Sequence, residues 1–172
     1  MKRSTTVKMA ILGAGALTLS ACGESTEEVL TYESVEACIA AGEQDDATCR
    51  AEFDKAKALH ETVAPRYQAS SSCYAEFGYN RCYRSSTGSY WLPFMVGYML
   101  APRMSTAAIY SQPLYRPSSN SNRFHTSSGV NVGNVSTSGR AQVAKSQTAR
   151  PQARTRTVAR GGFGARSWSS AS

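Results

Sequence analysis

Hydrophobic residues along the chain form three patterns that predict different structures. A short apolar run, Met9–Leu19, lies near the N-terminus and is soon followed by Cys22. Further along, apolar residues recur at steps of three and four, which predicts an amphipathic helix. The residues of this stripe are Cys49, Phe53, Ala56, Leu59 and Val63. The stretch Tyr90–Ala101 is apolar on every side and carries no charge, whereas periodicity is lost after about Arg116.

The predicted helix has clear limits. Asp45 or Asp46 would cap its N-terminus, and Pro65 would end it. Two acid–base pairs, each one turn apart, are expected on its solvent-facing side: Glu52 with Lys55 and Asp54 with Lys57. His60 lies near the edge of the stripe, which predicts a partly packed side chain.

Four cysteines follow Cys22 and fall into two similar units. They are Cys38, Cys49, Cys73 and Cys82. In each unit, a tyrosine stands six residues before the first cysteine and a glycine separates the two cysteines. An even number of cysteines in an exported chain indicates disulfides, and the repeat favours one bridge within each unit. Exchange of partners between the units stays open as an alternative.

Each cysteine unit also contains signals for a short helix. Ser34 and one of Ser70–Ser72 would cap the two N-termini. Gly42 and Gly78 would end the helices in a left-handed turn. About 60 residues with few large apolar side chains form only a small core, so the bridges are expected to be structural.

Residues that carry chemistry are sparse. The chain has no Cys-x-x-Cys pair and only His60 near these cysteines, which disfavours a zinc site or a redox role. The sequence shows no recognisable catalytic constellation. We therefore expect no enzymatic activity, no cofactor and no metal.

The N-terminal apolar run has the features of a bacterial lipoprotein signal. Basic residues precede it, and Leu19-Ser-Ala-Cys22 at its end is similar to a lipobox. This pattern predicts removal of residues 1–21 and acylation of Cys22, with palmitate among its chains, which would anchor the protein in the cell envelope. The run is too short for a transmembrane helix, but an ordinary signal peptide with a coincidental cysteine stays open. Gly23 in place of Asp favours the periplasmic side of the outer membrane.

Charge divides the mature chain into two unlike parts. Residues 23–76 carry all twelve carboxylates and four basic residues, whereas residues 77–172 carry twelve basic residues, eleven of them Arg, and no acid. A basic part of this kind is typical of an interaction tail, because Arg makes bidentate contacts to phosphate and carboxylate. We expect it to bind an anionic envelope polymer or an acidic protein. Alternatively, it folds back on the acidic part or stays solvated.

The tail, residues 118–172, is rich in Ser, Thr, Asn, Arg and Gly and is predicted to be disordered. Its expected binding residues are Arg154, Arg156, Arg160, Phe163 and Arg166. The segment Arg160-Gly-Gly-Phe-Gly164 is similar to RNA-binding segments. A single copy in an exported protein nevertheless disfavours nucleic acid as a partner.

The apolar stretch within residues 89–117 has two interpretations. It would pack on the small stapled module as its missing core, which is the default for such a run. Alternatively, Trp91, Phe94 and Tyr98 would contact the membrane interface or a partner.

Together these patterns predict a mainly α fold, in which a small disulfide-stapled helical module is followed by a long disordered basic tail. The expected order is a signal peptide (1–21), a lipidated linker (22–31), an acidic helical module (32–88), an aromatic segment with its connector (89–117) and the tail (118–172).

Several segments make the chain similar to a known family. They are the lipobox, the two Tyr-Cys-Gly-Cys units, Gly88–Met99, Gln112–Leu114 and Thr157–Gly164. On these segments the chain resembles the YgiB-type family of uncharacterised proteobacterial lipoproteins. It departs from the family at Ala101–Met104, where a Gly-rich stretch is expected, and in its shorter tail. The family has no established activity or site residues, so the resemblance implies none.

The resemblance carries two further implications. Family members are often encoded beside an ATP-grasp protein similar to glutathionylspermidine synthase, which implies a shared envelope process. The match near the C-terminus implies a docking motif, with Phe163 as its anchor and Arg160 as its charge contact.

The function expected from all these features is that of a non-enzymatic, lipid-anchored envelope protein. Its basic tail would bind an anionic polymer or an acidic protein. The alternative is an accessory subunit of an envelope enzyme or of the ATP-grasp-linked system.

Overall fold

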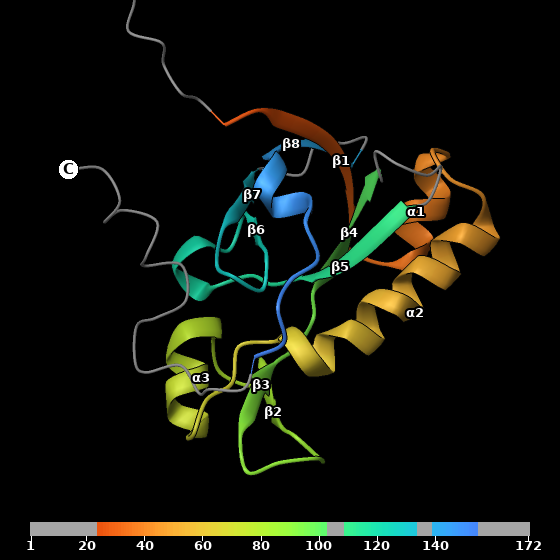
Figure 1. Cartoon of the computed structure of the whole chain (residues 1–172). Helices are drawn as coiled ribbons and strands as arrows, with labels where there is room; N and C mark the ends of the chain where they lie inside the picture. The colour runs from red at the N-terminus through yellow and green to blue at the C-terminus, as the bar shows by residue number, and fades with distance from the viewer. Residues whose placement is uncertain (1–23, 103–108, 134–138, 155–172) are drawn as a thin grey trace, which may run out of the picture.

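The structure, a computed structural model, describes residues 24–102, 109–133 and 139–154, which form a mixed α/β domain (Figure 1). Its α-helices are α1 (Val35–Ala41), α2 (Asp46–Val63) and α3 (Ser70–Phe77). Two short 3₁₀ helices are η1 (Ser118–Asn120) and η2 (Lys145–Thr148). The strands are β1 (Thr26–Tyr32), β2 (Cys82–Arg84), β3 (Trp91–Pro93), β4 (Gly97–Pro102), β5 (Ile109–Leu114), β6 (Phe124–His125), β7 (Asn131–Gly133) and β8 (Arg140–Ala144).

The main sheet is antiparallel, with the strand order β5-β4-β1-β8. β1 pairs with β4 through Leu30 and Leu100, and with β8 through Val29 and Ala141. The pairs β2–β3 and β6–β7 form two further, two-stranded sheets. The strand nearest the N-terminus is therefore held in the middle of the main sheet by segments far along the chain.

Both faces of the main sheet are covered. On one face, α1 and α2 pack over Tyr98 and Leu100, and on the other, β6 and β7 cover Met99 and Ala101. Successive side chains of a strand point to opposite faces, so β4 contributes to both cores. This placement explains why Gly97–Ala101 is apolar throughout, and it supports the core-packing interpretation for this part of the stretch.

A third cluster lies beside the sheet, where α3 packs on the β2–β3 hairpin around Tyr67, Phe77 and Leu92 (Figure 1). One disulfide, Cys73–Cys82, belongs to this cluster, and the other, Cys38–Cys49, joins α1 to α2. Each bridge closes within its own unit, which is the pairing that the repeat favours.

Helix ends follow the local sequence for α1 and α2 but not for α3. Ser34 and Asp45 each accept a hydrogen bond from the backbone N–H three residues ahead, at 3.2 and 2.9 Å. Gly42 ends α1 in the left-handed region, with φ of 67°. By contrast, Ser70–Ser72 lie inside α3 and no side chain caps it. Gly78 has φ of 102° and ψ of 158°, so the expected left-handed turn is absent there.

The expected mainly α fold with a tail disordered from residue 118 is wrong. Residues 118–133 and 139–154 contribute η1, β6, β7, β8 and η2, and residues 26–31, expected in a linker, form most of β1. This part of the chain folds although it has few apolar residues, because Phe124, Val132 and Val143 pack into a core that also contains residues of the main sheet. The remaining tail, residues 155–172, lies outside the described residues.

The acidic and basic parts of the chain contact each other directly. Arg140 on β8 forms ion pairs with Glu28 at 2.8 Å and with Glu43 at 2.6 Å. Arg116 pairs with Glu33. The described ranges contain twelve acidic and twelve basic residues, so their formal net charge is zero. Over these ranges the basic part folds back on the acidic part.

Candidate functional site

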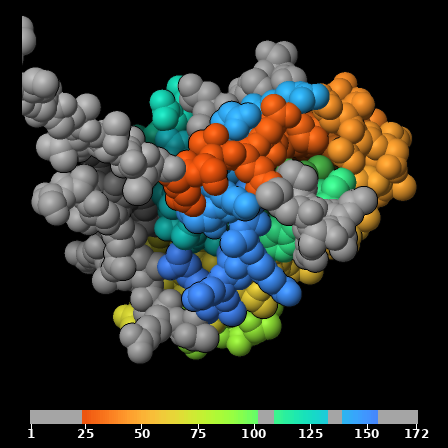
Figure 2. All heavy atoms as spheres, turned by 45° about the horizontal axis from the view of Figure 1, so that its top comes forward, coloured from red at the N-terminus to blue at the C-terminus, as the bar shows by residue number. Residues whose placement is uncertain are grey.

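A groove of about 570 Å³ lies beside residues 145–154, which we call the C-terminal strap. Its lining includes Gln112, Ser127, Ser128, Gln147, Arg150 and Arg154, and we call it the arginine groove. Every described residue that lines it comes from the acid-free part of the chain. Figure 2 shows the strap, in blue, at the surface of the molecule.

Hydrogen bonds tie the strap to the fold near its start and at its end. Near its start, the side-chain amide of Gln112 on β5 donates a hydrogen bond to the carbonyl of Gln147 at 2.7 Å. At its end, the backbone N–H of Arg154 donates to the carbonyl of Thr62 in α2 at 2.8 Å. These bonds position residues 149–153 as one wall of the arginine groove.

The two arginines of the groove differ in their surroundings. Arg154 is half-buried, and its guanidinium donates to the carbonyl of Ser127 at 2.6 Å. Arg150 is exposed and makes no hydrogen bond or ion pair with any described residue. Serine hydroxyls and glutamine amides add neutral donors around them. This arrangement can bind a phosphate or a carboxylate, because guanidinium groups make charge-assisted hydrogen bonds to both.

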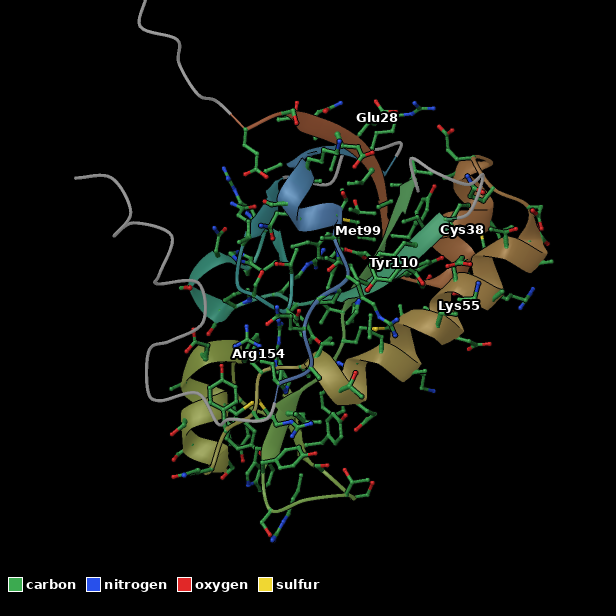
Figure 3. The ribbon with its side chains drawn as sticks, in the orientation of Figure 1. Glu28, Cys38, Lys55, Met99, Tyr110 and Arg154 are labelled. Carbon is green, nitrogen blue, oxygen red and sulfur yellow. A yellow bond between two sulfur atoms is a disulfide. The ribbon has the colours of Figure 1, made fainter. Side chains whose placement is uncertain are left out.

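A second groove, also of about 570 Å³, runs between α2 and β5, and we call it the Glu52 groove. Its lining includes Glu52, Lys55, Thr62, Tyr110, Ser111 and Arg150. Lys55 and Tyr110, labelled in Figure 3, lie on α2 and β5 at either side of it. Arg150 lines both grooves, so the two sites are contiguous at this residue.

Glu52 lies on the buried side of α2, so the prediction that it faces solvent is wrong. Its side chain is 7% exposed, and Oε1 accepts a hydrogen bond from Lys55 Nζ at 2.5 Å. The other carboxylate oxygen, Oε2, is buried without a hydrogen-bond partner among the described residues. The same holds for the hydroxyl of Ser111 across the groove. Buried polar atoms of this kind normally have a partner, so these two atoms mark the groove for a ligand or water.

His60 belongs to a chain of hydrogen bonds that runs from the buried Tyr115 to the exposed side chain of Glu61. The hydroxyl of Tyr83 donates to Glu61 Oε1 at 2.7 Å, so it accepts from His60 Nε2, which lies 3.0 Å away. Nδ1 of His60 then accepts from the hydroxyl of Tyr115 at 2.9 Å. Burial lowers the pKa of the His60 imidazole to about 4, against a smaller opposing effect of Glu61. Burial also raises the pKa of both tyrosines.

This chain of hydrogen bonds has a structural role. It joins α2 to the β2–β3 hairpin and to the residue that follows β5. His60 is 5% exposed, and none of the grooves described above is lined by it.

The part of the chain that the structure describes lacks two kinds of feature. It contains no group of three or more His, Cys, Asp or Glu side chains that could hold a metal ion. No helix there is both long enough and apolar enough to span a bilayer.

The three aromatic residues proposed for membrane or partner contact are separated. Tyr98 is fully buried between the sheet and α2, so it is not available for such contact. Trp91 is half-buried and packs edge-on against Tyr74 at 6.0 Å between ring centroids. Phe94 is 48% exposed and stacks on Tyr83 at 5.1 Å. Only Phe94 presents much of its ring to solvent.

Most of the remaining site residues lie outside the described residues. These are Cys22, Arg156, Arg160, Phe163 and Arg166. The exception is Arg154, which the structure places at the end of the strap (Figure 3).

Sequence reasoning missed the groove residues contributed by other elements. Gln112 and Ser127 carry no motif, and Arg150 was one of several tail arginines without a distinct role. The absence of acids after Glu76 was the one available signal that this part of the chain would form a groove without carboxylates.

Comparison with known proteins places the chain in a family. Residues 26–172 match the family described as "Protein of unknown function (DUF1190)". The chain belongs to the DUF1190 family. The match covers every described element, from β1 to the end of the strap.

Several relatives of this DUF1190 chain are enterobacterial proteins named UPF0441. One from Erwinia tasmaniensis is 36% identical over 85% of this chain and 74% of its own length. One from Pectobacterium carotovorum is 32% identical over the same shares. One from Photorhabdus laumondii is 31% identical over 91% of this chain and 79% of its own length. No solved structure matches the chain. The expectation of an uncharacterised bacterial family is confirmed at this level.

Proposed function

We propose that this chain is a non-enzymatic, lipid-anchored protein of the bacterial cell envelope that binds an anionic envelope polymer through its C-terminal arginines. One observation carries the proposal, namely that the arginine groove holds Arg150 and Arg154 and no described acidic residue lines it. Arg156, Arg160 and Arg166 follow in the sequence and extend the positive charge beyond the strap.

Charge balance points to the same segment. The described ranges are formally neutral, so the net positive charge of the mature chain comes from Arg103 and the three arginines after Arg154. Ion pairs within the fold already engage Arg116 and Arg140. The arginines from 150 onward form a run in the sequence, and the described members of that run have no ion pair, which suits this segment to an external anion.

The proposed anchor restricts how the domain sits at the membrane. Only four residue steps separate Cys22 from Thr26, the first residue of β1. A chain of that length spans at most about 14 Å, so the start of β1 would stay near the bilayer surface. The strap runs from that side of the molecule toward α3 and β3 (Figure 1), and Arg154 lies at its far end. The described part of the chain therefore ends away from the proposed anchor.

The envelope location itself is testable. Cells fed alkynyl palmitate should label the wild-type protein, and Cys22→Ser should lose the label because the acyl chains require that cysteine. A variant changed at Ser20 to another small residue serves as the control. Labelling that survives Cys22→Ser would remove the lipid anchor from the proposal.

Anion binding is tested on the mature chain reconstituted in neutral nanodiscs, with long-chain polyphosphate and polygalacturonate as probes. Binding should weaken steeply as salt rises from about 50 to 200 mM, because released counterions drive such binding. The double variant Arg150→Gln/Arg154→Gln should bind about tenfold more weakly than wild type, as loss of two charge-assisted contacts predicts.

The matched control is Arg123→Gln, which removes an exposed arginine outside the groove. It should leave the affinity close to that of the wild type. Equal weakening by Arg123→Gln, or affinity that does not change with salt, would refute binding at the arginine groove. Constant co-purification with an envelope enzyme, without polymer binding, would instead indicate an accessory subunit.

A further inference from the structure

The Glu52 groove has a negative base and a positive rim. At the base, the buried Oε2 of Glu52 and the buried hydroxyl of Ser111 have no hydrogen-bond partner among the described residues. At the rim, Lys55 and Arg150 are exposed. Glu52 is the one carboxylate among the described lining residues, and Lys55 pairs with its Oε1 at 2.5 Å, so Arg150 is the described rim cation without an ion pair.

We propose that this groove binds a zwitterionic group, in which a primary ammonium is joined to a phosphate or carboxylate. The ammonium would donate to Glu52 and Ser111, and the anion would contact Arg150. The proposal rests on the anion-binding function proposed above, because Arg150 lines both grooves. It adds a requirement for an amine in the bound unit of the polymer.

The ammonium of the proposed ligand matches the hydrogen-bonding capacity of Glu52 and Ser111. An ionised carboxylate accepts about four hydrogen bonds, and Lys55 occupies only Oε1 of Glu52. An ammonium has three donors and no acceptor, so it can donate to more than one oxygen. Both acceptor atoms are shielded from bulk water, so binding as proposed requires a small local shift of side chains that opens them to the ammonium.

Simpler ligands fit less well. A ligand with anionic groups alone would meet the carboxylate of Glu52 at the base of the groove and leave its free oxygen unpaired. A ligand with amines alone would meet Lys55 and Arg150 at the rim. A compact zwitterion avoids both repulsions, because its ammonium would face the carboxylate of Glu52 while its anion faces Arg150.

Three small probes separate these cases. Phosphoethanolamine carries both groups, glycerol 3-phosphate carries only the anion and ethanolamine only the amine. They are titrated by NMR into the mature chain with Cys22→Ser, which keeps the full domain in solution. We expect phosphoethanolamine to bind at least tenfold more tightly than either of the others, with shifts at the Ser111 amide.

Substitutions assign the two ends of the ligand. Glu52→Gln keeps the shape of the side chain and should abolish the preference for phosphoethanolamine over glycerol 3-phosphate. Arg150→Gln should weaken both phosphates alike. Lys57→Gln, on the exposed side of α2, is the matched control and should change neither. Thermal unfolding of each variant confirms that it is folded, and Ser111→Ala provides a second test of the base should Glu52→Gln not fold.

The outcomes separate this inference from the proposed function. Equal binding of phosphoethanolamine and glycerol 3-phosphate, with both weakened by Arg150→Gln, would overturn only the zwitterion proposal. A preference for phosphoethanolamine over glycerol 3-phosphate that persists in both Glu52→Gln and Ser111→Ala would also overturn only the zwitterion proposal. Failure of all phosphates and of the polyanions to bind would overturn both proposals.

The same chemistry occurs in a lipid headgroup and in a soluble unit. Vesicles of phosphatidylglycerol with phosphatidylethanolamine are therefore compared with vesicles in which phosphatidylcholine replaces the latter. Retention on the ethanolamine vesicles alone, lost with Glu52→Gln, would assign the site to the membrane lipid. Binding of soluble phosphoethanolamine without any vesicle preference would assign it to a soluble or polymer-linked unit.

Discussion

Nδ1 of His60 on α2 accepts a hydrogen bond from the hydroxyl of Tyr115 at 2.9 Å. Both residues are buried, and the other ring nitrogen of His60 is engaged by Tyr83. Protonation of His60 would turn Nδ1 into a donor that faces a hydroxyl already donating to it. The neutral imidazole is therefore the form that the fold stabilises, in agreement with its lowered pKa.

Stability should fall in mild acid because of His60. Burial lowers its pKa in the folded state to about 4, below the ordinary value of 6.5. Between these two values the unfolded chain binds a proton that the folded chain does not, so the free energy of unfolding decreases as pH falls through this window. The loss amounts to about 3 kcal/mol at the lower end. Urea unfolding of the wild type and of His60→Gln, from about pH 7 to 4, measures it.

The control concerns the only other histidine. Burial also lowers the pKa of His125, so its contribution has the same sign. In His125→Gln, the free energy of unfolding should still fall with pH by the amount due to His60. Only the double variant His60→Gln/His125→Gln should lose both contributions to this pH dependence. Identical slopes for the wild type and His60→Gln would contradict the assignment.

Gly139 should tolerate no side chain. It has φ of 75°, and a Cβ there would lie 2.8 Å from the carbonyl oxygen of Thr31. Its own carbonyl accepts from the backbone N–H of Thr31 at 2.6 Å. Gly139→Ala should therefore lower the free energy of unfolding by about 3 kcal/mol or more, from backbone strain and a steric clash together.

Gly42 is the matched control for this effect. It has a similar φ of 67°, but a Cβ there meets nothing within 4 Å. Gly42→Ala should lower the free energy of unfolding by about 1 kcal/mol, because it adds backbone strain without a steric clash. Chemical denaturation measures the loss of stability in both variants. Equal losses in Gly139→Ala and Gly42→Ala would contradict the close approach of Gly139 to the Thr31 carbonyl.

Each disulfide should contribute separately to stability. The two bridges join cysteines 11 and 9 residues apart, and loops of this size correspond to about 3 kcal/mol each in the chain-entropy model. The double variants Cys38→Ala/Cys49→Ala and Cys73→Ala/Cys82→Ala should each lose about that amount. Peptide mapping without reductant checks the pairing, and a peptide that links the two units would contradict it.

Truncation should reveal the contribution of β8 to the stability of the fold. A chain that ends after residue 138 lacks β8, which pairs with β1 from Thr26 to Leu30. It should lose cooperative unfolding, because β1 and Val143 are parts of the main sheet and its core. A chain that ends after Arg154 keeps every described element and should melt close to the full-length protein. Similar melting of both truncations would contradict the placement of β8.

Short-range features of the fold were open to prediction from sequence. The caps Ser34 and Asp45 bond to backbone groups three residues away, so only local spacing matters. The same is true of α2, which begins at Asp46 and ends before Pro65. The disulfides also close within about a dozen residues of sequence.

The buried side of α2 shows where local spacing stops being sufficient. The expected stripe contained Phe53 and Leu59, but the structure buries Glu52 and His60 beside the shared residues of the stripe. A polar residue at such a position is unfavourable until a partner is present. Tyr115 and Tyr83 supply that partner for His60, and they lie 55 and 23 residues further along the chain.

The sequence by itself determined the limits of α1 and α2 and the uneven distribution of charge, and it favoured the observed cysteine pairing, because each depends on residue type and on near neighbours. Only the tertiary structure decided the sheet, because β1 becomes a strand through pairing with residues 98–100 and 140–144. It likewise decided that Arg150 lines two grooves, with Glu52 at the base of one. Strand formation and groove lining are long-range properties, since both depend on side chains and backbone that meet only when distant segments fold together.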